Sequence, residues 1–194
     1  MSFRFDEESH TYFLGDRKLP SVTQILRGAG MLYYPASPSS EYHMERGTLV
    51  HKATEMIDKG TLDWDTLDET LRPYCEAYAN FCSSVNMADI IISEKPMYHP
   101  RYLFAGKPDR VIQMNGLRSL IDIKSGSPHP ATKIQISAYC ELVQANEKIP
   151  FIKGFSLYLR DDGTYRLDEI GDMKRHFQTF IAALSVVRWR EEYL

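Results

Sequence analysis

Residues 106–111 (GKPDRV) and 120–126 (LIDIKSG) carry the pattern that decides the fold. Successive side chains of a β-strand point to opposite faces, so Asp122 and Lys124 project to one side while the isoleucines beside them project to the other. We therefore expect two neighbouring strands, with the isoleucines buried and with the acid and the amine facing a cleft.

Asn115 and Gly116 predict the turn between these two runs, because this pair is typical of two-residue β-hairpins. Pairing about that turn would bring Asp109 near the level of Asp122 on the next strand. Two carboxylates and the amine of Lys124 would then converge. Hard oxygen ligands of this kind suit Mg²⁺ or Mn²⁺, so the sequence predicts a divalent-metal site.

An Asp-x-Lys triplet is a weak signal when taken alone, because roughly one per 130 positions is expected by chance at ordinary composition. This chain has three, at residues 16–18, 122–124 and 172–174. The first lies in a predicted hairpin turn and the third opens a predicted helix. Only the middle triplet alternates with β-branched residues and follows a Pro-Asp pair on a preceding strand.

The chain has 194 residues, of which 43% are hydrophobic and 25% charged, as expected of one soluble globular domain over residues 1–194. It has no run of eighteen apolar residues and its first residues lack a signal-peptide pattern, so we expect a cytoplasmic protein with no membrane contact. Cys75, Cys82 and Cys140 are odd in number and lack metal-binding spacing. A net charge of −3 gives no global support to nucleic-acid binding.

Hydrophobic periodicity predicts an α/β fold in which a central mixed sheet is flanked by helices. The predicted strands are a hairpin at 3–19, a strand at 90–98 with its partner at 102–105, the central pair, a strand at 151–159 and its partner at 165–167. The predicted helices begin at residue 20 and cover 40–59, 65–87, 131–146 and 172–192.

Two helix starts carry capping signals. Ser21 followed by Gln24 fits a capping box, and Asp65 or Thr66 could cap the helix at 65–87. In the loop that follows the first helix, the paired residues 33–34 (YY) could stack on bases or cover the core, and packing is the commoner role of aromatic side chains.

Residues spaced four apart share one face of a helix, and two such pairs are candidates for the site. His51 and Glu55 lie on the helix at 40–59, while Gln135 and Tyr139 lie on the helix at 131–146. A lone helical histidine is more often structural than a ligand. Glu94 either assists the site or is a charge on an exposed strand face, and both interpretations stay open.

Four motifs in this order resemble those of the PD-(D/E)XK nuclease superfamily, in its RecB-type and phage exonuclease-like branch. They are residues 46–51 (RGTLVH), 106–109 (GKPD), 122–124 (DIK) and 135–139 (QISAY). The resemblance implies a restriction-endonuclease-like core over about residues 40–168. It also implies a metal-dependent DNA nuclease, foremost an exonuclease, that acts in phage-type recombination, repair or genome processing in a bacterial or phage-infected cell.

The resemblance also implies roles for individual residues. The expected metal ligands are His51, Asp109, Asp122 and the backbone carbonyl of Ile123, with Glu55 and Glu94 as helpers. The expected catalytic residues are Asp109, Asp122, Lys124, Gln135 and Tyr139. Lys124, which is protonated near neutral pH, would orient water and stabilise developing charge, while Gln135 and Tyr139 would hold the scissile strand.

Four basic residues are expected to contact the backbone phosphates of DNA, namely Arg46, Lys107, Arg110 and Lys133. Such contacts are largely independent of sequence, so we expect an exonuclease or a structure-dependent nuclease rather than a site-specific restriction enzyme. The cysteine set of iron–sulfur nucleases is missing, so we expect no such cluster. The G-x-x-x-x-G-K-[ST] motif is also missing, so unwinding would come from a helicase or recombination partner.

Three other interpretations remain open. The central stretch could be an Asp–Lys pair that stabilises an ordinary sheet. The protein could be a catalytically silent module that keeps the fold and binds nucleic acid or a partner, although both acids of the site are present. It could also be a structure-dependent endonuclease.

Overall fold

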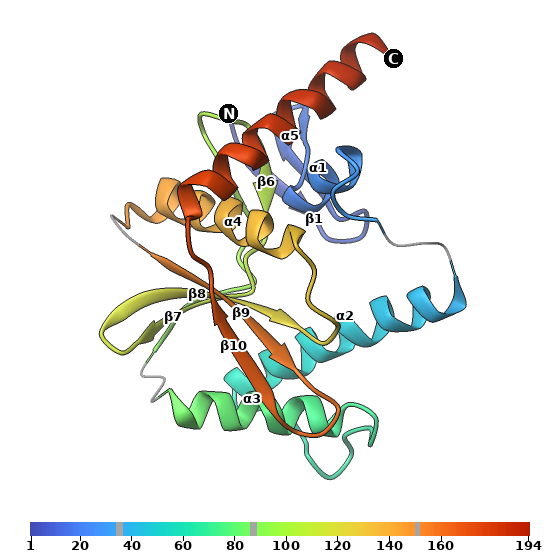
Figure 1. The fold of residues 1–194 in the computed structure, drawn as a ribbon, viewed down its shortest axis with the longest axis vertical. Coiled ribbons are helices and arrows are strands. Elements are labelled where there is room, and N and C mark those ends of the chain that lie inside the picture. The colour runs from blue at the N-terminus through green and yellow to red at the C-terminus, as the bar shows by residue number, and fades with distance from the viewer. Residues whose placement is uncertain (34–36, 86–88, 150–151) are drawn as a thin grey trace.

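A computed structural model describes residues 1–33, 37–85, 89–149 and 152–194, without the side chains of residues 38–40 (Figure 1). Three of the expectations fall outside these ranges. They concern Tyr34, the helix end at residue 87 and the strand start at residue 151. No helix in the described ranges is both long and apolar enough to span a membrane.

Five strands form the central sheet, and their spatial order is β10-β9-β8-β7-β4. They are β10 (Tyr165–Glu169), β9 (Lys153–Leu159), β8 (Leu117–Lys124), β7 (Arg110–Met114) and β4 (Ile90–Ser93). Neighbours are antiparallel except β8 and β9, which are parallel. A parallel pair needs a crossover, and α4 (Ala131–Glu147) supplies it. The predicted mixed sheet is therefore confirmed.

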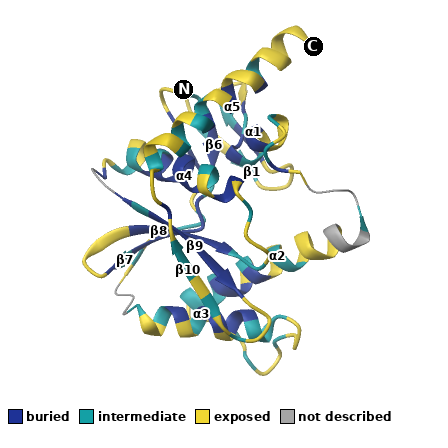
Figure 2. Cartoon of the chain, in the orientation of Figure 1, coloured by how far each residue is buried: buried dark blue, intermediate teal, exposed yellow. Residues whose placement is uncertain are grey.

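Helices cover both faces of this sheet (Figure 1). α1 (Val22–Gly28), α4 and α5 (Met173–Tyr193) pack on one face, and α2 (Pro38–Asp58) and α3 (Arg72–Ser84) on the other. Leu120 belongs to the first core, whereas Ile121 and Ile123 belong to the second. Alternation along β8 thus buries both isoleucines, as expected, and both cores are the dark layers beside the strands in Figure 2.

The predicted N-terminal hairpin is part of a three-stranded sheet of β1 (Phe3–Asp6), β2 (Thr11–Leu14) and β3 (Arg17–Leu19). The capping box that begins α1 is confirmed. Ser21 Oγ accepts the N–H of Gln24 at 3.1 Å, and Gln24 Oε1 accepts the N–H of Ser21 at 2.9 Å. These bonds fix where α1 starts, and with it the position of the next turn of the helix.

The helix predicted over 65–87 is wrong at its start, because α3 begins at Arg72. Pro73 occupies its first turn, where the missing N–H costs nothing. In a helix that began at residue 65, Pro73 would be interior and would clash with the carbonyl of residue 69. The predicted caps at Asp65 and Thr66 are therefore also wrong.

The strand predicted over 90–98 is broken in the middle. β4 ends at Ser93, and Glu94 then turns the chain with a φ of +48°. Pro96 lacks the N–H that a ladder needs. The chain becomes extended again in β5 (Met97–Tyr98), which pairs with β6 (Ala105–Gly106), so the break sends Glu94 away from the strand it was assigned to.

Candidate metal centre and active site

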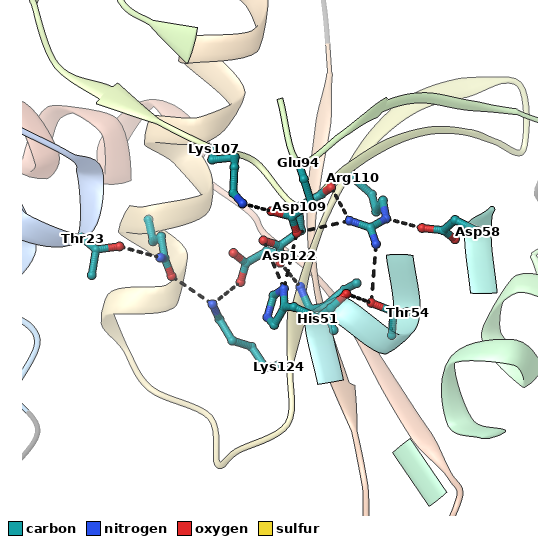
Figure 3. Close-up of polar contacts among 12 residues, drawn as sticks. Thr23, His51, Thr54, Asp58, Glu94, Lys107, Asp109, Arg110, Asp122 and Lys124 are labelled. Carbon is teal, nitrogen blue, oxygen red and sulfur yellow. Dashed lines mark hydrogen bonds and ion pairs between the residues drawn. The ribbon is translucent and has the colours of Figure 1, made fainter. Parts of the chain in front are cut away.

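Side chains from three separate parts of the chain converge at the end of the central sheet (Figure 3). His51 comes from α2, Glu94 from the turn after β4, and Asp109 from the residue before β7. His51 Nδ1 lies 3.5 Å from Asp109 Oδ1 and 3.7 Å from Glu94 Oε1. One ligand atom from each of the three lies within 4.8 Å of the others. The three side chains could therefore share one metal ion.

Asp109 is held by the neighbouring strand. Arg110 pairs with Ile121, and continuing this register places Asp109 opposite Asp122, as the hairpin predicted. Asp109 Oδ2 accepts the N–H of Ile123 at 2.7 Å. Asp109 is 8% exposed and Asp122 is 1% exposed. Two buried carboxylates thus stand side by side at the end of β7 and β8.

Lys124 connects Asp122 to α4. Its Nζ lies 2.7 Å from Asp122 Oδ2 and donates to Gln135 Oε1 at 3.1 Å. Gln135 Nε2 is in turn 3.5 Å from Thr23 Oγ1 on α1 (Figure 3). The structure therefore brings Gln135 to the predicted site. It also adds Thr23, whose only signal in the sequence is its place next to the capping box.

Tyr139 lies one turn beyond Gln135 on α4 and is 7% exposed. Its ring packs directly on Gly106, where a Cβ would stand 2.7 Å from Tyr139 Cε1, closer than side chains tolerate. Burial and the carboxylates of Asp122 and Asp109 raise the pKa of Tyr139. The phenol therefore stays protonated near neutral pH and can act as a hydrogen-bond donor.

Glu94 belongs to the site, so the alternative of an exposed strand charge is excluded. Its side chain is 15% exposed, and its Oε2 lies 2.9 Å from Lys107 Nζ. Burial alone would raise the pKa of Glu94, but the hydrogen bonds from His51 and Lys107 outweigh it and the pKa falls to about 2. Glu94 is thus an anion at every pH near neutrality.

Arg110 is not available to a DNA phosphate, which corrects the expectation for this residue. Its side chain is 1% exposed and forms an ion pair with Asp58 on α2. Nη1 donates to the main-chain oxygen of Asp109 at 2.7 Å and lies 3.3 Å from Glu94 Oε1. Nη2 lies 3.5 Å from Thr54 Oγ1. The guanidinium therefore ties α2 to the two acids of the site.

A signal for this role exists on α2, where His51, Thr54 and Asp58 follow helical spacing and share one face. Thr54 Oγ1 donates to the main-chain oxygen of His51 at 2.9 Å. Tyr78 of α3 donates to Asp58 Oδ1 at 2.7 Å. One face of α2 thus carries both a candidate ligand and the groups that hold Arg110.

The predicted helper Glu55 lies elsewhere. Its carboxylate pairs with Lys59, one turn further along the helix, at 2.6 Å, and it is not part of the group formed by His51, Glu94 and Asp109. A residue four positions from His51 shares its general direction but not its target. The assignment of Glu55 as a helper is therefore wrong.

The other basic residues are placed differently from one another. Arg46 donates from Nη2 to the main-chain oxygen of Ser125 at 2.9 Å, and its guanidinium lies 5.0 Å from the ring centre of Tyr74. Lys107 is engaged with Glu94, and Lys133 is exposed on the first turn of α4. Their contacts with phosphate stay predictions.

Gathering acids here concentrates negative charge where water is scarce. Burial raises the pKa of Asp109 to about 6, with Asp122 and Glu94 acting in the same direction and His51 against it. Burial lowers the pKa of His51, but the carboxylates of Asp109 and Glu94 outweigh it, so the net shift is upward. A cation would relieve this repulsion.

The donor set fits a divalent ion. Carboxylate oxygens suit Mg²⁺ and Mn²⁺, and imidazole is accepted by Mn²⁺ and later transition metals. Asp122 Oδ2 is buried and accepts no hydrogen bond within the described residues, although Lys124 Nζ forms an ion pair with it. Two carboxylates, one imidazole and a neighbouring acid with spare acceptor capacity match a small, hard cation.

Comparisons with known proteins bear on the fold. No family model matches the sequence, and neither does any curated protein. A solved structure from Eubacterium rectale, described as a candidate exonuclease, is similar over 88% of this chain and 74% of that chain, with 11% identity and a TM-score of 0.51. This likeness shows the fold alone. An alkaline exonuclease from Laribacter hongkongensis overlaps 90% of this chain and 92% of that one, at 15% identity and a TM-score of 0.39, which is too low to carry an argument.

Proposed function

We propose that this protein is a metal-dependent deoxyribonuclease of the PD-(D/E)XK superfamily, in its RecB-type branch, and that it acts as an exonuclease. The observation that carries the proposal is the convergence of His51, Glu94 and Asp109 beside the ion pair of Asp122 and Lys124. The fold similarity to a candidate exonuclease is consistent with it. A role in phage-type recombination, repair or genome processing rests on the sequence resemblance.

His51, Glu94 and Asp109 would hold Mg²⁺ or Mn²⁺, with Asp122 and the carbonyl of Ile123 as further ligands. When bound, such an ion activates water and offsets charge on the phosphate. Asp109 is kept in place by the N–H of Ile123, and Glu94 by Lys107 and the buried Arg110. The ligands are thus fixed before any ion arrives, which favours catalysis.

Lys124 would orient the attacking water and stabilise the charge that develops on the phosphate. Its ammonium is held between Asp122 Oδ2 and Gln135 Oε1, so its direction is set by two contacts on opposite sides of the site. Tyr139 stays protonated and would donate to the bound strand, next to Gln135. These four side chains come from one strand and the helix that follows it.

Base identity plays no part in this scheme. Lys107 and Lys133 would contact backbone phosphates, which are the same at every step of DNA. The proposal therefore expects digestion that depends on the presence of an end rather than on sequence.

The test compares wild type with Asp122→Asn and with the matched control Asp65→Asn, an exposed loop acid. Substrates are end-labelled linear duplex, single-stranded DNA and closed circular DNA, with Mg²⁺, Mn²⁺ or EDTA. We expect metal-dependent loss of linear but not circular DNA, at least about 1,000-fold slower in Asp122→Asn because a metal-site acid is lost, and unchanged in the control.

Other outcomes would assign other functions. Cutting of circular DNA would make the protein an endonuclease. Binding of DNA without cutting would make it a binding module, and cutting that survives both EDTA and Asp122→Asn would refute the proposed site.

A further inference from the structure

A cavity of about 880 Å³ lies on the far side of β8 from the three candidate ligands. It is bounded by β9, β10, the loop before α4 and the first turns of α4 and α5. None of its side chains belongs to the candidate metal centre. Lys133 is the one member already expected to contact phosphate.

Strand register connects this cavity to the metal centre. In the parallel pair of β8 and β9, Asp122 is level with Ser156, and Lys124 is level with Tyr158. Level residues of neighbouring strands point to the same face, and the strands are about 4.8 Å apart. Ser156 and Tyr158 both line the cavity. The cavity therefore begins one strand beyond Asp122 and Lys124, on the same face of the sheet.

The cavity offers a flat cationic surface. Arg166 on β10 is paired across the sheet with Tyr158, and its guanidinium lies 5.0 Å from the centre of that ring. The Arg166 side chain is 45% exposed. Arginine planes stacked in this way present a face on which a nucleobase can stack without regard to its identity.

Hydrogen-bond donors surround that surface. His129 Nδ1 accepts the N–H of Ala131 at 3.1 Å, so the proton of the neutral ring is on Nε2, which is then a donor. Lys133 is exposed, and among the described residues it has no carboxylate within ion-pair distance. Both side chains line the cavity.

The acids of the cavity are already matched by cations. Asp168 Oδ2 lies 2.8 Å from Arg166 Nη2, and Glu169 Oε1 lies 2.7 Å from Lys153 Nζ. The charge of Lys133 is therefore in excess over these two pairs. An anion that enters the cavity meets donors and a net positive charge.

We propose that this cavity binds the nucleotides next to the scissile phosphate of a single nucleic-acid strand, with Lys133 on phosphate and Arg166 under a base. The inference rests on the proposed nuclease function. The volume falls within the roughly 300–1,000 Å³ of sites that hold small ligands, which suits one or two nucleotides and not a duplex. Gly126, in the loop between cavity and metal centre, has no heavy atom within 4 Å of where its Cβ would stand, so the loop is low there.

The test measures binding of a labelled single-stranded 10-mer by fluorescence anisotropy, in EDTA and, in the Asp122→Asn background, with Mg²⁺. Lys133→Ala/Arg166→Ala is compared with Lys18→Ala/Arg118→Ala, which removes the same charge from exposed strand positions outside the cavity. We expect at least tenfold weaker binding for the cavity variant alone, and a salt dependence of log K lower by about 1.4, from 0.7 per lost phosphate contact.

A kinetic readout separates this role from a structural one. In hydrolysis of single-stranded DNA, the cavity variant should raise KM about tenfold while kcat at saturation stays within twofold, because uniform binding is lost. Equal affinities for the cavity and control variants would overturn the proposal. An equal loss on blunt duplex would overturn the single-strand assignment. Because binding is measured without cutting, a wild type that cuts nothing refutes only the proposed function and leaves this result readable.

Discussion

Asp109 shows what a gathering of acids costs the protein when no cation is present. Its pKa rises from an ordinary value of 3.8 to about 6, mainly through burial. Between those values the folded state binds more protons than the unfolded state, so stability falls as pH rises through about 4 to 6. Above pH 6 the cost is fully present.

Asp109→Asn should therefore stabilise the metal-free protein. At pH 7.5 in EDTA we expect its Tm to rise by about 3–6 °C, the size of a change of one to two kcal/mol in a chain of this length. The gain should shrink as the pH is lowered toward 4. With Mn²⁺ the order should reverse, because only wild type keeps the ligand. Thermal melts at several pH values check this, and a variant less stable than wild type in EDTA would contradict it.

Glu94 gives a second prediction at the same scale, and Glu55 is its natural control. Glu94→Gln should weaken binding of Mn²⁺ at least tenfold, because it neutralises one of the two carboxylates within reach of His51. Glu55→Gln should change the affinity less than twofold, since its carboxylate pairs with Lys59 instead. Isothermal titration of the metal-free proteins measures both. Equal losses in the two variants would show that the ion is held elsewhere.

At the scale of elements, the buried Arg110 network joins α2, α3, β4 and β7. Asp58→Ala would leave the guanidinium without its ion-pair partner at 1% exposure, and stranding a buried charge typically costs about 3–5 kcal/mol. We expect that loss in the free energy of unfolding by denaturant. Asp65→Ala, an exposed acid on the loop after α2, should stay within about 0.5 kcal/mol of wild type. A loss below about 1 kcal/mol in Asp58→Ala would mean that the network is not a structural tie.

Sequence reasoning predicted those elements whose cause is local. The meeting of Asp109 and Asp122 follows from a hairpin turn five to six residues away from each strand's site end, and alternation decides which face they share. Arg110 was assigned to DNA because its partner Asp58 lies 52 residues away, on another element. Nothing between the two positions reveals that they meet.

Two boundaries failed for backbone reasons that the pattern of apolar residues does not show. Pro73 moved the start of α3, and the left-handed turn at Glu94 ended β4 early. That same turn decides the role of Glu94, because a continued strand would have carried its carboxylate away from His51. The candidate ligand set was therefore predictable for His51 and Asp109 and not for Glu94.

At the scale of the whole molecule, the central sheet joins the two main cores, since each face of β8 contributes to one of them. That residues 1–194 form one folding unit stays a prediction. Trp64 lies between α2 and α3, and Trp189 lies on α5, so the two report on opposite sides of the sheet. Single-tryptophan variants with Phe at the other position should unfold at the same denaturant concentration. Separate midpoints would show two units.

His51, Glu94 and Asp109 meet in space but are spread over 59 positions of the chain, and the N–H that fixes Asp109 belongs to Ile123. On the ribosome these groups therefore emerge well apart in time. A nascent chain cannot hold the proposed ion until residues beyond Ile123 have left the exit tunnel and β8 has paired with β7. The potential to cut nucleic acid would thus appear late in synthesis, after the polypeptide has moved away from the template that encodes it.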